Sequence, residues 1–363
     1  MNLLTYNYRV NTARFIFFIN PMLNLIEIMM MEICMSQSCY AMMVTRLGPP
    51  DVMQYQVMEM PEPKDHEALI EQTAVGVNFV DIYLRVGQAH AHNPEPPFIT
   101  GVHAVGIVKN VGSKVSEVQI GDRVTYTNAG VGTYCSHVAV ASDRLVVVPN
   151  NVSDERCAAG FVRVMTAQYL LKQMRPLHTG DKVLIHAAAG GTGQVLVQWA
   201  KRMGLEVFVT AGSEEKIRFV KELGADHVIN YRTSDFAQEV GKITHGKGVK
   251  VVFESVGKDT FMGSLECLEP KGLAINFGTA SGQVENFALQ SLHAKSLWIC
   301  RPTLRTYIAD KHDLQTMAKE AFEILGDPSF RLDIEAVLPL KEAAKAHTMI
   351  ESRLTKGAVV LVP

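Results

Sequence analysis

The chain has 363 residues, of which 47% are hydrophobic and 20% charged, and its formal net charge is −2. This length exceeds what one hydrophobic core normally organises, so we expect two domains. The composition is that of a folded globular protein and excludes a disordered one. A near-neutral charge gives no long-range attraction for nucleic acid or anionic membranes. It therefore favours a cytoplasmic protein that acts on a small molecule.

Residues 1–34 form an apolar, methionine-rich extension ahead of the first regular pattern. Polar residues and Pro21 interrupt it, so it falls short of the roughly 20 apolar residues of a membrane span. Three interpretations stay open here: a disordered tail, a mitochondrial presequence carrying Arg9 and Arg14, or sequence ahead of a true start at Met35. We predict no membrane contact, and a mitochondrial location only if the extension is a presequence.

Residues 35–162 contain a series of short predicted strands. The segments rich in β-branched residues and bounded by Gly, Pro, Asn or Asp are 68–75, 106–111, 123–127 and 145–149. Short strands separated by turn residues are typical of a barrel-like β domain.

Residues 163–301 alternate between strands and helices. We predict strands over 183–187, 207–210, 227–230, 249–253 and 273–277. Helical patterns follow the first three of them. Such βαβ units build the doubly wound parallel sheet of a Rossmann domain, so the predicted fold class is α/β. Residues 302–363 end in a predicted strand, helix and strand, which we expect to return to the first domain.

A glycine-rich turn joins the strand over 183–187 to the helix that follows it. The turn reads Ala188-Ala189-Gly190-Gly191-Thr192-Gly193. Glycines here let the backbone approach a pyrophosphate closely, and the helix N terminus offers free N–H groups to that anion. A glycine cluster alone is weak evidence for a binding site. Between a hydrophobic strand and an amphipathic helix, however, such a cluster predicts a dinucleotide site.

The end of the second strand indicates which dinucleotide binds. NAD-binding proteins usually carry Asp or Glu at this point, to bind the ribose 2′-hydroxyl. The chain instead has Ala211-Gly212-Ser213, which leaves room for a phosphate, and Lys216 follows within one turn. Glu214 and Glu215 oppose this interpretation, although acids are also favoured at a helix N terminus. NADPH is therefore predicted over NADH.

Eight motifs occur in order along residues 40–363. They cover 77–83, 121–124, 180–201, 228–232, 254–259, 276–278, 301–302 and 351–353. In this combination the chain resembles the quinone oxidoreductase and zeta-crystallin family of zinc-free medium-chain dehydrogenase/reductases. The resemblance implies a GroES-like β-barrel domain over 35–162 and 302–363 and a Rossmann NADPH-binding domain over 163–301. It also implies a deep cleft between them and a homodimer formed through the Rossmann domains.

The resemblance also assigns site residues. It places Asn78 and Tyr83 beside the nicotinamide as catalytic residues, able to hydrogen-bond an acceptor oxygen or the cofactor carboxamide. It assigns Lys216, Tyr231 and Arg353 to the 2′-phosphate. The remaining predicted cofactor-binding residues are Asp81, Thr166, Ala189, Gly190, Gly191, Thr192, Gly193, Ser213, Ser255, Val256, Phe277, Gly278 and Arg301.

No metal site is predicted. Zinc enzymes of this superfamily need three protein ligands for a catalytic zinc and four close cysteines for a structural one. Asn78 stands at the position of the first catalytic cysteine, and the sequence has no four-cysteine lobe. His103 replaces an acid usual in related sequences, and we expect it to hydrogen-bond locally. A metal site made of His90, His92 and His103 is the weaker alternative.

These features predict a zinc-independent, NADPH-dependent quinone oxidoreductase. One alternative is an NADPH-dependent reductase of α,β-unsaturated aldehydes or ketones. Another class of alternative is a zeta-crystallin-like RNA-binding or structural protein, although dispersed lysines such as Lys242 and Lys250 form no basic stripe. The stretches 88–93 and 163–169 depart from the family, with Gln168 where tyrosine is common. We expect both stretches to face the acceptor pocket.

Overall fold

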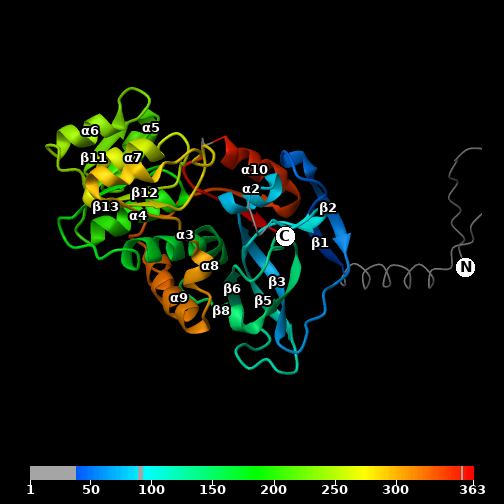
Figure 1. The fold of residues 1–363 in the computed structure, drawn as a ribbon. Helices are drawn as coiled ribbons and strands as arrows, with labels where there is room; N and C mark the ends of the chain where they lie inside the picture. Colours follow the sequence, from blue (N-terminus) through cyan, green and yellow to red (C-terminus); the bar gives the residue numbers. More distant parts are fainter. Residues whose placement is uncertain (1–37, 89–92, 353–354) are drawn as a thin grey trace, which may run out of the picture.

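The structure is a computed structural model that describes residues 38–88, 93–352 and 355–363. One part of the molecule is built on a parallel sheet and the other mainly on antiparallel pairings, with β15 and β16 as a parallel pair, and the two parts lie side by side (Figure 1). The predicted α/β class is confirmed. Among the described residues, no helix combines the length and apolarity that a membrane crossing requires. The expectations for residues 1–34 concern a segment outside the described residues.

The parallel sheet has six strands in the order β11-β10-β9-β12-β13-β14. Its strands are β9 (Lys182–Ile185), β10 (Glu206–Ala211), β11 (His227–Asn230), β12 (Val249–Glu254), β13 (Leu268–Asn276) and β14 (Trp298–Cys300). The helices between them are α4 (Gly191–Arg202), α5 (Glu214–Glu222), α6 (Phe236–Ile243) and α7 (Phe261–Cys267). β9 lies between β10 and β12, so the strand order reverses there, and such a switch point opens a crevice beyond the carboxyl ends of the strands.

The β9 strand shows why this region reads as a continuous apolar run. Val183 and Ile185 pack into one hydrophobic core, whereas Leu184 packs into another. Helices cover both faces of a parallel sheet, so successive side chains on opposite faces are all buried. The predicted strand 183–187 stops at Ile185 because the chain turns at Ala187, whose φ is +49°.

The second part contains a seven-stranded sheet with the path β15-β16-β3-β5-β6-β8 and β7 paired to β3, and a three-stranded sheet β2-β1-β4. The larger sheet is formed by β3 (Glu67–Gly76), β5 (His103–Val111), β6 (Arg123–Thr127), β7 (His137–Ala141), β8 (Val146–Val147), β15 (Ile334–Pro339) and β16 (Ala358–Val362). The smaller sheet is formed by β1 (Cys39–Val44), β2 (Met53–Met58) and β4 (Phe98–Ile99). β16 pairs antiparallel with β3, so the end of the chain joins the sheet formed near its beginning.

Five further helices lie in the described residues. They are α2 (Phe79–Val86), α3 (Asp154–Lys172), α8 (Leu304–Tyr307), α9 (Lys311–Leu325) and α10 (Ala343–Glu351). Short 3₁₀ segments are η1 (Pro50–Val52), η3 (Ser142–Arg144), η4 (Leu289–Lys295) and η5 (Leu340–Glu342). α3 contacts β3 and β5 as well as α4, and it runs between the two parts (Figure 1). The domain limits 35–162, 163–301 and 302–363 stay a proposal, because the limit at 162/163 falls inside this continuous helix.

Candidate active site

The glycine-rich turn lies between β9 and α4. A side chain at Gly193 would place its Cβ 2.3 Å from the carbonyl oxygen of Ala187, so only glycine lets α4 pack this close to the strand. A Cβ at Gly190 would meet only that oxygen, at 3.1 Å, and otherwise faces open space. The first N–H groups of a helix have no intrahelical acceptor, so those of Gly191 and Thr192 are available to a ligand. The turn therefore fits a pyrophosphate.

A second corner of the site forms where β10 and β11 end beside each other. Ser213 is the N-cap of α5, and its hydroxyl accepts a hydrogen bond from the backbone N–H of Lys216 at 3.3 Å. Tyr231 follows β11 and is half exposed, and its hydroxyl lies so close over Gly212 that a Cβ there would be 2.5 Å from it. The structure thus brings Ser213, Tyr231 and the backbone of Lys216 together. Arg353 lies outside the described residues.

Glu215 is one of the two acids that oppose a phosphate at this corner. Its carboxylate pairs with the ammonium group of Lys356 from the C-terminal segment. This hydrogen bond lowers the pKa of Glu215 and raises the pKa of Lys356. The negative charge of Glu215 is therefore balanced inside the protein and does not oppose a phosphate as strongly as the sequence suggests.

A buried hydrogen-bond network shapes the turn after β12. Glu254 is fully buried, and its Oε1 accepts from the backbone N–H groups of Val256 at 2.7 Å and Gly257 at 3.0 Å. Its Oε2 accepts from the hydroxyl of Ser264 at 2.7 Å, and Ser264 lies 3.0 Å from Nε2 of His186. Burial lowers the pKa of His186. The network fixes the predicted residues Ser255 and Val256, and sequence reasoning missed both Glu254 and His186 as its members.

The loop after β13 lies against that turn. A Cβ at Gly278 would come within 2.7 Å of the Ser255 carbonyl oxygen, so the two loops touch. The guanidinium of Arg301 hydrogen-bonds the side-chain oxygen of Asn276, the last residue of β13. Phe277 packs against the main core while staying partly exposed. Phe277, Gly278 and Arg301 thus lie together at the carboxyl edge of the sheet, as predicted for parallel strands.

Asn78 and Asp81 begin helix α2 on the barrel side. Asn78 is the N-cap, and its Nδ2 donates to the carbonyl oxygen of Gly76 at 3.1 Å. Asp81 is fully buried, and its Oδ2 accepts from the Asn78 N–H at 2.8 Å and from the Tyr134 hydroxyl at 3.2 Å. Burial raises the pKa of Asp81 to about 7. Asp81 therefore holds Asn78 in place.

Tyr83 connects the two parts of the molecule. Its hydroxyl oxygen accepts a hydrogen bond at 3.0 Å from the backbone N–H of Thr279, in the loop after β13. The hydroxyl proton of Tyr83 is not used in this bond and remains able to donate. Thr166, on α3, donates its own hydroxyl proton to the Val162 carbonyl oxygen at 2.7 Å, so its oxygen remains able to accept. Both groups are therefore available for polar contacts with a ligand.

His103 is fully buried and hydrogen-bonds locally, as predicted. Its Nε2 lies 3.1 Å from the Thr125 hydroxyl, which also donates to the Ala104 carbonyl oxygen at 2.9 Å. The ring stacks on Phe161 with centroids 5.7 Å apart. Burial, with the nearby positive charge of Arg163, lowers the pKa of His103 to about 3, which keeps it neutral.

The metal alternative involves residues that the structure does not describe in full. His90 and His92 lie outside the described residues. Within 38–88, 93–352 and 355–363, no group of three His, Cys, Asp or Glu side chains is arranged to hold a metal ion. Gln168, the departure on α3, is buried and accepts a hydrogen bond from Gln173 at 2.7 Å. Its amide is therefore engaged within the protein.

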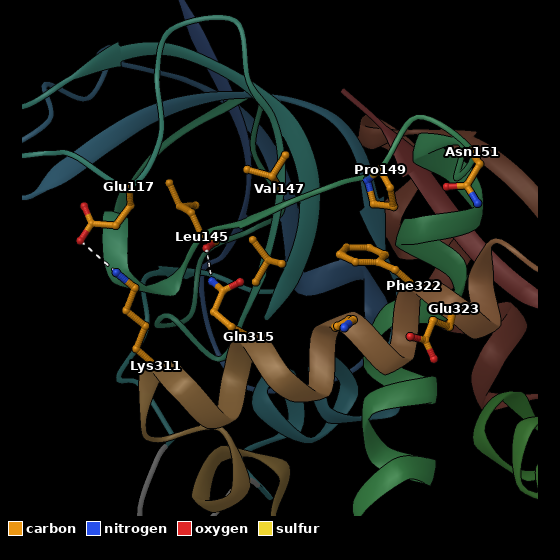
Figure 2. Close-up of a pocket in the computed structure, with 11 residues that line it drawn as sticks. Glu117, Leu145, Val147, Pro149, Asn151, Lys311, Gln315, Phe322 and Glu323 are labelled. Atoms are coloured by element: carbon orange, nitrogen blue, oxygen red, sulfur yellow. Dashed lines mark hydrogen bonds and ion pairs between the residues drawn. The ribbon is translucent and has the colours of Figure 1, made fainter.

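A separate hollow of about 780 Å³ lies between β8 and α9. Figure 2 shows two contacts that span it, from Lys311 to Glu117 at 3.1 Å and from Gln315 to the Leu145 carbonyl oxygen at 3.1 Å. Its lining includes neither the glycine-rich turn nor any residue of α2. The switch-point crevice is the stronger candidate, because the glycine turn, the strand ends and Tyr83 converge on it.

Comparison with known protein families assigns both parts. Residues 64–150 match the alcohol dehydrogenase GroES-like domain, which confirms the predicted barrel type. Residues 191–323 match the family described as zinc-binding dehydrogenase. A GroES-like barrel beside a dinucleotide-type sheet defines the class of medium-chain dehydrogenase/reductases.

Individual relatives narrow this class. A quinone oxidoreductase of Salmonella typhimurium is 38% identical over 319 residues, which cover 87% of this chain and 97% of the relative. A 2-haloacrylate reductase of Burkholderia is 37% identical over 89% of this chain and 98% of the relative. The crystal structure of Escherichia coli quinone oxidoreductase complexed with NADPH superposes with a TM-score of 0.86 at 36% identity, covering 89% of this chain and 100% of that one. The chain belongs to the quinone oxidoreductase family.

Proposed function

We propose that this protein is an NADPH-dependent oxidoreductase that reduces quinones without zinc. The observation that carries the proposal is the corner at the end of β10, where Gly212 lies under the Tyr231 hydroxyl beside Ser213 and Lys216. This corner has space and positive charge in place of the acid that binds a ribose hydroxyl. The Escherichia coli relative, crystallised with NADPH, supports this choice of cofactor.

The chain's own residues divide the work of binding between the two sides of the cleft. The turn over 188–193 would hold the pyrophosphate with backbone N–H groups, and Lys216 and Tyr231 would hold the 2′-phosphate. The loops carrying Ser255 and Phe277 would line the rest of the groove. Arg353 belongs to the same proposal through the family resemblance.

Asn78, Tyr83 and Thr166 supply polar groups on the barrel side. When bound, NADPH supplies a hydride from C4 of its nicotinamide. Tyr83, held by the Thr279 N–H, can donate its proton to an acceptor oxygen or an amide, and Asn78 is oriented by Asp81 for a similar contact. Quinone oxygens can take protons from water, so the proposal assigns no general acid.

A reductase of activated alkenes is the second candidate. The Burkholderia relative is named for the reduction of 2-haloacrylate, and it matches this chain at 37% identity. The deciding experiment is a steady-state screen of NADPH oxidation with 1,4-benzoquinone, 2-cyclohexenone, crotonaldehyde and 2-chloroacrylate. We expect the highest kcat/KM with the quinone. A kcat/KM that is higher for an alkene than for the quinone would replace the first candidate by the second.

The zinc-independent mechanism is a further part of the proposal, although one matched family is described as zinc-binding. Asn78 stands where a cysteine ligand would be required, and His103 already uses its Nε2 within the protein. We expect dialysis against a chelator to leave turnover unchanged. Loss of turnover that zinc restores would refute this part, and a zinc-containing alcohol dehydrogenase treated in parallel serves as the control.

We further propose a homodimer formed through the parallel sheets. β14 is the edge strand of that sheet, and it exposes Trp298 by 66% and Ile299 by 38%. Leu289, in the segment before it, is 73% exposed. An open strand edge with apolar side chains is a natural pairing surface. Light scattering should give twice the chain mass, and Trp298→Lys should give a monomer; a monomeric wild-type protein would refute the dimer.

Cytoplasmic location and the lack of a nucleic-acid partner also stay proposals. Lys242 pairs with Glu239 at 2.7 Å, and Lys250 pairs with Asp181 at 2.6 Å. Their charges are balanced locally, which supports a small-molecule function over RNA binding.

A further inference from the structure

Two arginines of the described residues are almost completely buried, and their surroundings differ. Arg85, on α2, pairs with the carboxylate of Glu351. Arg163, on α3, is 8% exposed, and its Nη1 has no hydrogen-bond partner among the described residues. Burial alone accounts for the lowering of its pKa to about 10, with no contribution from any acid. Arg163 therefore carries a buried positive charge that the described part of the chain does not neutralise.

The guanidinium of Arg163 lies against the first residue of α4. A Cβ at Gly191 would be 2.6 Å from Cζ and Nε of Arg163 and 2.9 Å from its Nη1. Glycine at this position is what admits the guanidinium. The planar cation thus stands next to the free N–H groups of the first turn of a twelve-residue helix, where the helix dipole also favours negative charge.

A buried charge without a partner destabilises a folded protein. Proteins keep such groups where a ligand or a reaction uses them, and perturbed charges cluster at functional sites. The neighbouring His103 is neutral and does not balance this charge. The group that would balance the charge of Arg163 beside the first turn of α4 is an anion.

We propose that Arg163 is an anion-binding residue of the cleft, and that its ligand is an oxyanion lying against the first turn of α4. Two ligands offer this chemistry. One is a phosphate oxygen of the dinucleotide, and the other is the carboxylate of an acidic acceptor such as a 2-haloacrylate. The inference rests on the dinucleotide site proposed above, to which it adds a side-chain cation from α3.

If an arginine has a purely structural role, its replacement should lower the stability of the protein, whereas replacement of Arg163 should raise it. Helix α3 contains such a structural arginine. Arg156 donates to the backbone carbonyl oxygens of Leu325 at 2.6 Å, Asp327 at 3.1 Å and Phe330 at 2.8 Å. Arg156→Met breaks these bonds and should lower the melting temperature of the free protein. Arg163→Met removes an unbalanced charge and should raise it.

The experiment combines thermal unfolding of the free protein with direct titrations of NADPH and NADH, for wild type, Arg163→Met, Arg163→Lys and Arg156→Met. If the ligand is a phosphate, Arg163→Met should weaken both dinucleotides by roughly 10- to 100-fold, because a charge-assisted hydrogen bond is lost. Arg163→Lys should recover part of the affinity. Gly191→Ala should weaken both dinucleotides as well, because its methyl group displaces the guanidinium without removing the charge.

If the ligand is an acceptor carboxylate, the dinucleotide affinities should stay unchanged. The kcat/KM of Arg163→Met should then fall for 2-chloroacrylate and remain unchanged for 1,4-benzoquinone. Unchanged dinucleotide affinity together with unchanged acceptor preference would overturn the proposal. Wild-type protein that binds neither dinucleotide would refute the proposed function separately. In that case the melting temperature still tests the inference. A melting temperature that is lower in Arg163→Met than in wild type, as expected for Arg156→Met, would show that Arg163 is a structural residue and would overturn the proposal.

Discussion

The parallel-sheet part and the barrel part of the molecule differ in how many of their buried polar groups are satisfied. On the sheet side, Glu254 and His186 have hydrogen-bond partners at every side-chain nitrogen or oxygen, and Gln194 Oε1 in α4 is the buried atom left without a partner among the described residues. On the barrel side and along α3, several buried atoms lack a partner among the described residues. They belong to Asp81, Arg85, His103, Thr133, Arg163 and His347.

This difference reflects two ways of building a site. In the proposed site, the sheet side would bind with backbone N–H groups, so its side chains would need only to leave space and hold loops in place. The barrel side would present side chains to the ligand, which requires polar groups placed in advance of it. Buried groups left unsatisfied lower stability, and they concentrate where function requires them.

Substitution of Gly193 should produce the largest effect, because it acts on the sheet side where space is the requirement. In Gly193→Val the Cβ overlaps the Ala187 carbonyl oxygen and α4 must move outward. Displacement by about an ångström can cost roughly 100-fold, so we expect at least that loss of NADPH affinity. The control is Gly241→Ala in α6, where nothing lies within 4 Å and binding should be normal. Wild-type affinity for NADPH in Gly193→Val would contradict the proposal that the site requires close packing of α4 against the Ala187 carbonyl oxygen.

Substitution of Asp81 tests whether the ionised form of this buried carboxyl group lowers the stability of the folded protein. Its pKa is raised from 3.8 to about 7 in the folded protein, so folding favours its protonated form. This contribution to stability is fully present below about pH 4 and is lost as the pH rises through 7. Between pH 5 and 8 the free energy of unfolding of wild type should fall by roughly 2–3 kcal/mol relative to Asp81→Asn.

Urea denaturation of both proteins at each pH measures this change. The comparison with Asp81→Asn is needed because His103 and His347 have pKa values lowered to about 3 and act in the opposite direction. Their contributions are common to both proteins and cancel in the difference. An equal difference at pH 5 and 8 would show that Asp81 is charged throughout this range.

Substitution of Lys216 should give the next largest effect, and it should change the affinity for NADPH but not the affinity for NADH. Lys216→Ala removes a cation from the corner formed with Ser213 and Tyr231. A charge-assisted hydrogen bond contributes about 1.5–3 kcal/mol, so NADPH should bind roughly 10- to 100-fold more weakly while NADH is little affected. Lys221→Ala, near the end of the same helix, is the control. An unchanged ratio of the two affinities would remove the basis for choosing NADPH.

Substitution of Tyr83 should give the smallest effect, and it should change turnover instead of NADPH affinity. Tyr83→Phe removes the hydroxyl that accepts from the Thr279 N–H across the cleft. One such bond contributes about 1 kcal/mol, so we expect kcat to fall by roughly fivefold with little change in NADPH affinity. Tyr231→Phe is the matched control and should weaken NADPH affinity instead. Normal turnover in Tyr83→Phe would show that the bond across the cleft is not needed.

The sequence alone determined the class of the sheet and the position of its glycine-rich turn. The strand over 227–230 has the predicted bounds, and the helix predicted after it is α6, with Asp235 as its N-cap. These features depend on local patterns: apolar runs bounded by turn residues, and glycines at a strand end. The same locality explains why Ala211-Gly212-Ser213 could indicate NADPH without a structure.

Tertiary structure alone decided how the side chains meet. Asp81, predicted beside the cofactor, is buried beneath Asn78, and Glu215 is paired with Lys356. The bond from Thr279 to Tyr83 and the contact of Arg163 with Gly191 join segments far apart in the chain. Local sequence pattern fixes which face of an element is apolar, but the partner of a buried polar group depends on how the elements pack. The cofactor-binding residues could therefore be proposed one by one from the sequence, whereas the partners of the buried polar groups required the fold.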